Sequence, residues 1–137
     1  MKSTRLPGKP LKIINNKPLI YWTWKNCSKA IAENKIFVAT DSKKIIKVCN
    51  QYGIQSIMTS SNCLTGTDRV AQASRLIDKN IILNIQGDEP LLDPNDIRKV
   101  INMKLKYSNS VINCMSRFDS TEATNRNIPK VVSNFNN

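Results

Sequence analysis

The chain has 137 residues, the length of one ordinary domain, and 40% of them are hydrophobic and 23% charged, which excludes wholesale disorder. The net charge is +11, but the lysines are dispersed and do not alternate with aromatic residues as on a single-strand-binding surface. We therefore expect no nucleic-acid partner and keep a basic polyanion-binding protein as the last alternative. No apolar run approaches the ~18 residues of a membrane span and no signal peptide is visible, so we expect a cytoplasmic protein without a membrane partner.

The N-terminal third predicts a loop followed by one amphipathic helix. Residues 1–11 contain two prolines and a glycine, which disfavour regular structure. Pro18 suits the first turn of a helix running to about Asn34. An apolar stripe along this helix is formed by Ile20, Trp24, Cys27 and Ile31.

Short apolar runs then alternate with helical patterns along the rest of the chain. The predicted strands are 36–40, 54–59, 81–86 and 110–115, with a further one beginning at Lys130. The predicted helices are 42–53, 66–77 and 93–105, with Ser42, Gly66 or Thr67, and Asp93 as caps. This alternation predicts βαβ units and a mostly parallel sheet in a three-layer α/β sandwich, as one domain over residues 1–137.

The four cysteines indicate neither a metal site nor a disulfide framework. Cys27, Cys49, Cys63 and Cys114 are scattered without a C-x-x-C pair. The chain has no histidine, which excludes Cys/His zinc sites and every mechanism that needs an imidazole base. We expect buried or incidental thiols in a reducing compartment.

The loop Ser3–Lys9 combines hydroxyls, a glycine and two cations ahead of a helix. Backbone donors with Arg5 and Lys9 would suit a triphosphate. The loop lacks the spacing of a P-loop, and the alternative is a solvated basic loop.

A second loop, Leu64–Arg69, meets the start of a helix. Its small residues Thr65, Gly66 and Thr67 could contact a base or a ribose at the carboxyl edge of the sheet. The alternative is a helix cap, with Asp68 favourable in the first turn.

The third loop, Gln86–Pro90, follows the most apolar predicted strand. Ligand sites of open α/β sheets lie at this position, and the Asp88 carboxylate could hold Mg²⁺ against phosphate oxygens. The alternative is an ordinary acidic surface turn. Taken together, the three loops predict a nucleotide-using transferase.

Four motifs occur in order along the chain. They are S-T-R-L-P-G-K-P-L at Ser3–Leu11, V-A-T-D at Val38–Asp41, T-G-T-D-R at Thr65–Arg69 and I-Q-G-D-E-P at Ile85–Pro90. With them the chain resembles the 3-deoxy-manno-octulosonate (Kdo) cytidylyltransferases, or CMP-Kdo synthetases, over essentially its whole length. The segment Asn127–Val132 is similar to the N-x-x-K-V-V segment of that family.

The resemblance implies a Rossmann-like, GT-A-like nucleotidyltransferase fold and attack of a sugar-acid hydroxyl on the α-phosphate of CTP, releasing pyrophosphate. The substrates would be CTP and a 2-keto-3-deoxy sugar acid, and the product would serve lipopolysaccharide or capsule biosynthesis. By the same resemblance, Ser3, Arg5 and Lys9 bind the triphosphate, Thr65, Gly66 and Thr67 surround the cytidine, Gln86 lies near the sugar acid, Asp88 binds Mg²⁺, and Arg5, Lys9 and Asp88 carry catalysis.

The chain also departs from this family. Family members are longer at both ends, where they carry a first strand, homodimer contacts and a second metal-binding aspartate. Cys63 stands where many relatives have histidine. We therefore expect the chain as written to be poorly stable and inactive, because strands next to the first one would lack pairing. A cytidylyltransferase for a neuraminate-like sugar acid and a nucleotide-binding module without turnover remain alternatives.

Overall fold

The computed structural model describes residues 8–115, 121, 124–126, 128, 130 and 131. In chain order its elements are the 3₁₀ turn η1 (Lys9–Leu11), β1 (Ile13–Ile14), β2 (Lys17–Pro18), α1 (Leu19–Ser28), the 3₁₀ turn η2 (Glu33–Lys35), β3 (Val38–Thr40), α2 (Lys43–Gln51), β4 (Ser56–Met58), α3 (Gly66–Ser74) and α4 (Pro94–Lys106). None of the helices in this part of the chain combines the length and hydrophobicity of a membrane span.

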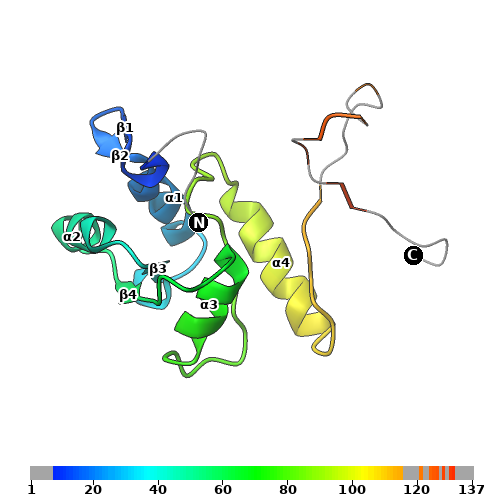
Figure 1. Cartoon of the computed structure of the whole chain (residues 1–137). Coiled ribbons are helices and arrows are strands. Elements are labelled where there is room, and N and C mark those ends of the chain that lie inside the picture. Colours follow the sequence, from blue (N-terminus) through cyan, green and yellow to red (C-terminus); the bar gives the residue numbers. More distant parts are fainter. Residues whose placement is uncertain (1–7, 116–120, 122–123, 127, 129, 132–137) are drawn as a thin grey trace.

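A βαβ unit forms the centre of the fold. Strand β3 pairs in parallel with β4, so that Val38 lies opposite Ser56 and Thr40 opposite Met58. Helix α2 connects the two strands and packs against both (Figure 1). A parallel pair needs such a crossover, and the expected α/β class is confirmed.

Two of the predicted helix caps, Ser42 and Asp93, agree with the structure, whereas the cap of α3 is Thr65 and not the predicted Gly66 or Thr67. The Ser42 hydroxyl accepts a hydrogen bond from the Ile45 N–H at 3.4 Å and starts α2. Gly53, with φ of 67°, provides the left-handed residue after the same helix. Asp93 caps α4 by accepting from the Asn95 N–H at 2.8 Å, and Pro94 takes the first helical position.

Helix α1 provides much of the core. Leu19, Ile20, Thr23, Trp24 and Cys27 are its buried residues. Trp24 forms a cluster with Cys49 of α2 and Ile54 ahead of β4. The helix ends at Ser28, before the predicted Asn34, and the Ser28 hydroxyl donates to the Lys25 carbonyl at 3.0 Å. Such side-chain bonds to the backbone compete with the continuation of a helix.

A short hairpin precedes α1, where the sequence had predicted only loop and helix start. Strands β1 and β2 pair antiparallel, with Ile14 opposite Lys17. The two residues between them, Asn15 and Asn16, have φ of 47° and 60°. A type I′ hairpin turn requires positive φ at both positions, and asparagine is among the few residues that tolerate it.

The predicted strands 81–86 and 110–115 are wrong as strands. Neither segment pairs with a strand in the described part of the chain. Residues 81–86 nevertheless alternate between half-buried and exposed positions, the period of a strand. A strand is defined by its ladder of hydrogen bonds, so the apolar pattern alone was not sufficient. The strand predicted to begin at Lys130 extends beyond the described residues.

Candidate functional site

Two of the predicted site residues are joined by an ion pair. The Lys9 Nζ donates to the Asp88 Oδ2 at 2.5 Å, across 79 positions of sequence. Each side chain is 37% exposed, so the pair is accessible from solvent. The structure therefore brings the first and third predicted loops together.

The backbone at Lys9 is held in a tight turn. Gly8 precedes it with φ of 68° and ψ of 21°, a left-handed conformation that favours glycine. Within the turn, the Lys12 N–H donates to the Lys9 carbonyl at 3.1 Å. The Leu19 N–H in turn donates to the Lys12 carbonyl at 2.8 Å and attaches the loop to the start of α1.

The backbone around Asp88 is held by the same helix. The Thr23 hydroxyl donates to the Gly87 carbonyl at 3.2 Å, and the Asn26 Nδ2 donates to the Pro90 carbonyl at 2.7 Å. A Cβ on Gly87 would lie 2.9 Å from the Ile20 Cδ1, so only glycine fits without a shift. Sequence reasoning missed Thr23 and Asn26. The sequence pattern that could have identified them is a pair of polar residues, three positions apart, next to the apolar stripe of the helix.

The T-G-T loop forms a complete capping box at the start of α3. The Thr65 Oγ1 accepts from the Asp68 N–H at 3.1 Å, and the Asp68 Oδ2 accepts from the Thr65 N–H at 2.8 Å. The capping interpretation of this loop is therefore confirmed. It leaves the nucleotide-binding interpretation open, because a capped helix start still presents its loop to a ligand.

The same loop lies beside the third one. The Asn84 Nδ2 donates to the Thr67 Oγ1 at 3.5 Å. The amide of Gln86 lies against Gly66, at 3.4 Å from a Cβ placed there. The three predicted loops thus share one region of the molecule, and Gln86 and Asp88 connect them.

Arg69 is a buried junction that sequence reasoning did not single out. Its Nη1 donates to the Thr59 Oγ1 at 2.5 Å and to the Ser60 carbonyl at 3.3 Å. Its Nη2 lies 3.1 Å from the Asp41 Oδ2, an ion pair whose angle does not make a hydrogen bond. Since Asp41 and Thr59 directly follow β3 and β4, Arg69 ties α3 to the carboxyl ends of both strands. The sequence did contain a signal for this contact, because Asp41 and Arg69 are each the last residue of one of the four motifs.

Ser3 and Arg5 lie outside the described residues. Among the residues that are described, no cluster of three or more Cys, Asp or Glu side chains could hold a metal ion. Asp88 provides a hard oxygen donor, and it already faces a cation, the Lys9 ammonium. One carboxylate completed by phosphate oxygens and water is a donor set that suits Mg²⁺.

Two of the four cysteines are buried in the core. Cys27 and Cys49 are buried, and burial raises the pKa of both thiols. They are therefore neutral packing residues, as predicted. Cys63 is half-buried, and its Sγ donates to the Gln72 Oε1 at 3.2 Å.

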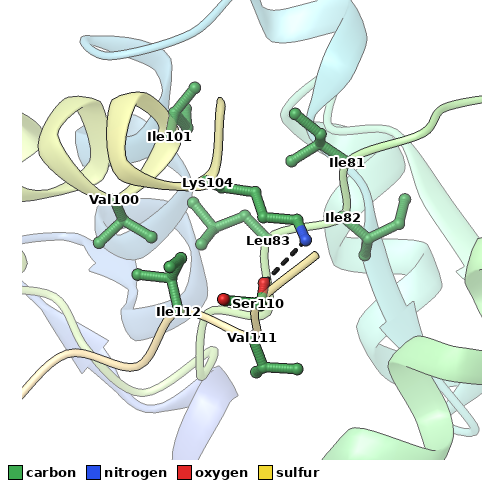
Figure 2. Close-up of a pocket in the computed structure, with 9 residues that line it drawn as sticks. All are labelled: Ile81, Ile82, Leu83, Val100, Ile101, Lys104, Ser110, Val111 and Ile112. Atoms are coloured by element: carbon green, nitrogen blue, oxygen red, sulfur yellow. Dashed lines mark hydrogen bonds between the residues drawn. The ribbon is translucent and has the colours of Figure 1, made fainter. Parts of the chain in front are cut away.

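A cavity of about 240 Å³ lies between residues 81–83, helix α4 and residues 110–112. Figure 2 shows the aliphatic side chains gathered around it and the Lys104 ammonium directed to the Ser110 carbonyl, which accepts at 2.8 Å. The lining side chains include no acid. This cavity is an apolar packing surface, and the polar loops described above are the better candidate for a triphosphate site.

Comparison with known proteins decides the family. The whole chain, residues 1–137, matches the family described as Cytidylyltransferase. The chain belongs to the cytidylyltransferase family. The four motifs, with Lys9, Gln86 and Asp88 among their residues, lie within the matched range.

Individual relatives agree with this membership. The 3-deoxy-manno-octulosonate cytidylyltransferase of Pseudomonas fluorescens (strain Pf-5) is 37% identical over 98% of this chain and 54% of its own length. The 8-amino-3,8-dideoxy-manno-octulosonate cytidylyltransferase of Shewanella sp. (strain W3-18-1) is 40% identical over 74% of this chain and 42% of its own. This cytidylyltransferase chain thus spans about half the length of the curated relatives it matches.

A solved structure shows the same fold. It is described as CMP:2-keto-3-deoxy-manno-octonic acid synthetase complexed with CTP. It has a TM-score of 0.74 and 31% identity, over 78% of this chain and 44% of its own. The expected Rossmann-like nucleotidyltransferase fold is therefore confirmed for this cytidylyltransferase.

Proposed function

We propose that the protein is a CTP-dependent cytidylyltransferase that activates Kdo, giving CMP-Kdo and pyrophosphate. The observation that carries this proposal is the convergence of the three loops: Lys9 is bonded to Asp88, and Gln86 lies against Gly66. A cation, a carboxylate and an amide are thereby available in one region to a triphosphate, a divalent metal and a sugar acid. The relatives named for Kdo support the choice of substrate.

Each loop has a separate role in this proposal. Lys9, together with Ser3 and Arg5, neutralises and orients the triphosphate. The T-G-T loop surrounds the cytidine with Thr65, Gly66 and Thr67. The side chains of this loop are small, so a base ring can approach its backbone closely. The Gln86 amide can donate to and accept from the hydroxyl and carboxylate oxygens of the sugar acid.

Asp88 is the residue we propose as the Mg²⁺ ligand. When bound, Mg²⁺ would neutralise phosphate charge and lower the pKa of the attacking hydroxyl. The protein's own contribution is positioning. The bonds from Thr23 and Asn26 fix the loop around Asp88, and rigid positioning of charges is the main requirement in phosphoryl and nucleotidyl transfer.

The remaining proposals concern the setting of the reaction. CTP and a 2-keto-3-deoxy sugar acid are the proposed partners, and the full-length protein would be a homodimer serving lipopolysaccharide or capsule biosynthesis. We propose a cytoplasmic location, which is supported by the four free thiols. No nucleic-acid or membrane partner is part of the proposal.

Binding of CTP with and without Mg²⁺ tests the assigned roles. Wild type should bind CTP more tightly with Mg²⁺ present, as measured by calorimetry. In Asp88→Ala this gain should fall by about tenfold or more, because one charge-assisted ligand is lost. Glu89→Gln removes a neighbouring exposed carboxylate and should keep the gain. An Asp88→Ala variant with the full Mg²⁺ dependence would refute the role of Asp88.

The sugar acid has a second candidate. Relatives from two Shewanella strains, each 40% identical, are named for 8-amino-3,8-dideoxy-manno-octulosonate. Pyrophosphate release should therefore be compared with Kdo, its 8-amino form and a neuraminate. Preference for Kdo supports the proposal, preference for either of the others replaces it, and CTP binding without any release favours a nucleotide-binding module.

A further inference from the structure

The ion pair between Lys9 and Asp88 joins two groups to which the proposed function gives different partners. Lys9 is assigned to phosphate oxygens and Asp88 to a divalent cation. In the structure they instead bind each other, at 2.5 Å. The ammonium thus occupies one carboxylate oxygen of the metal ligand.

We propose that Lys9 is an internal competitor for the cation position at Asp88. A divalent cation alone would bind weakly, and it would bind tightly only with a nucleotide whose phosphates take over the ammonium. The protein would then admit the metal together with its nucleotide. This inference rests on the proposed function and adds to it how the metal and the nucleotide are coupled.

Electrostatics makes the two cations mutually exclusive at Asp88. An ammonium hydrogen-bonded to the carboxylate would lie within a few ångströms of a metal on the same group, and like charges repel strongly at that range. Phosphate oxygens offer the ammonium charge-assisted hydrogen bonds of the same kind. Exchange of partners therefore keeps both charges paired, whereas arrival of the metal alone would leave the Lys9 ammonium with water as its only partner.

The structure allows this exchange with side-chain motion alone. The turn at Lys9 and the loop at Asp88 are both attached to α1 through their backbones. Both side chains are 37% exposed, which lets a ligand reach them. A lysine has a flexible stem and a compact charge with three donors, so it can turn from one acceptor to another.

Titration of the full chain with Mn²⁺ alone, followed by electron paramagnetic resonance, tests the competition. Lys9→Gln should bind Mn²⁺ about threefold to tenfold more tightly than wild type, because the competing charge is gone. Lys9→Arg keeps a cation and should remain close to wild type. Lys12→Gln removes an exposed charge from the same loop and should not raise the affinity. Adding Asp88→Asn to Lys9→Gln should abolish the gain.

The outcomes separate this inference from the proposed function. If Lys9→Gln is folded by circular dichroism and binds Mn²⁺ as wild type does, while wild type binds CTP with Mg²⁺, the competition is refuted and the function stands. An equal gain in Lys12→Gln also refutes it, because the effect would be one of net charge. If wild type binds no CTP at any Mg²⁺ concentration, the proposed function fails and the exchange with it.

Discussion

Gly87 lies close against α1, with no space for a Cβ beside Ile20. Its φ is not in the left-handed region, so the requirement for glycine is one of space. The nearest atom to an added Cβ is the Ile20 Cδ1 at 2.9 Å, and Ile20 is a buried core residue. The loop that carries the candidate metal ligand is therefore placed by steric fit as well as by hydrogen bonds.

This contact yields a prediction about Gly87→Ala. The substitution should lower the free energy of unfolding by about 1–3 kcal/mol, because it overpacks a close contact. In an Ile20→Val background, which removes the Cδ1, the penalty should be smaller. Urea unfolding followed by tryptophan fluorescence measures both. Gly66→Ala provides the control, since its nearest neighbour is the Gln86 amide at 3.4 Å, and an equal loss there would contradict the argument.

At the scale of single residues, the sequence indicated which type of ligand a side chain would bind, but not which other side chain it contacts. Lys9 and Asp88 were each assigned a charged ligand, but no local pattern could show that they bind each other. Their meeting depends on α1 holding two loops at once. Thr23 and Asn26, which do part of this, are ordinary helix residues to any pattern that scores apolar stripes.

At the scale of elements, helix α3 is joined to the ends of two strands by a single side chain, that of Arg69. Arg69 is 9% exposed and reaches the residues that follow β3 and β4. Because this buried cation has partners just after each of two strands, it fixes the orientation of α3. It thereby also fixes the position of the T-G-T loop at the start of the helix. The position of that loop therefore depends on a residue that we do not expect to touch the nucleotide.

Arg69→Ala should accordingly destabilise the protein by about 1–3 kcal/mol, because it leaves the buried Thr59 hydroxyl without its partner. Arg69→Lys should recover only part of the lost stability. A lysine has a single ammonium in place of the planar guanidinium, so it cannot contact both strand ends at once. Arg75→Ala, an exposed position just after the same helix, should change stability by less than about 0.5 kcal/mol. Thermal and urea unfolding provide the measurement. If Arg69→Ala lost no more stability than Arg75→Ala, Arg69 would not be what holds α3 to the strand ends.

The elements that were predicted correctly are those specified by local chemistry. Ser42 and Asp93 could be identified as caps because a cap involves only residues two or three positions away. The segment 81–86 has the right period for a strand but no strand partner in the described part of the chain, and pairing is not encoded locally. The turn at Asn15 and Asn16 was missed for the opposite reason: its strands are too short to show a period.

For the whole molecule, charge is the dominant property. A net charge of +11 attracts any polyanion at long range, and that attraction is screened within about 8 Å at physiological salt. Nucleotide binding through specific contacts and general polyanion binding should therefore respond differently to ionic strength. This difference separates the cytidylyltransferase from the basic-binder alternative.

We predict that the chain binds duplex DNA weakly at low salt and loses most of this binding by about 200 mM salt. Binding of CTP with Mg²⁺ should persist at that salt concentration, because contacts at half-buried groups are screened less. Fluorescence anisotropy with labelled DNA, with and without CTP, measures both. DNA binding that survives physiological salt, in a chain that CTP does not affect, would favour the polyanion binder instead.

The attachment of both site loops to one early helix has a consequence for biosynthesis. Thr23 and its acceptor on Gly87 are 64 positions apart, and Lys9 and Asp88 are 79 apart. At translation rates of about 5–20 residues per second, the N-terminal half of the site waits roughly 4–16 s for its other half to be made. During that interval the face of α1 that carries Ile20 and Thr23 lacks its partner. The nascent chain is thus exposed to non-native contacts at the same surface on which its chemistry later depends.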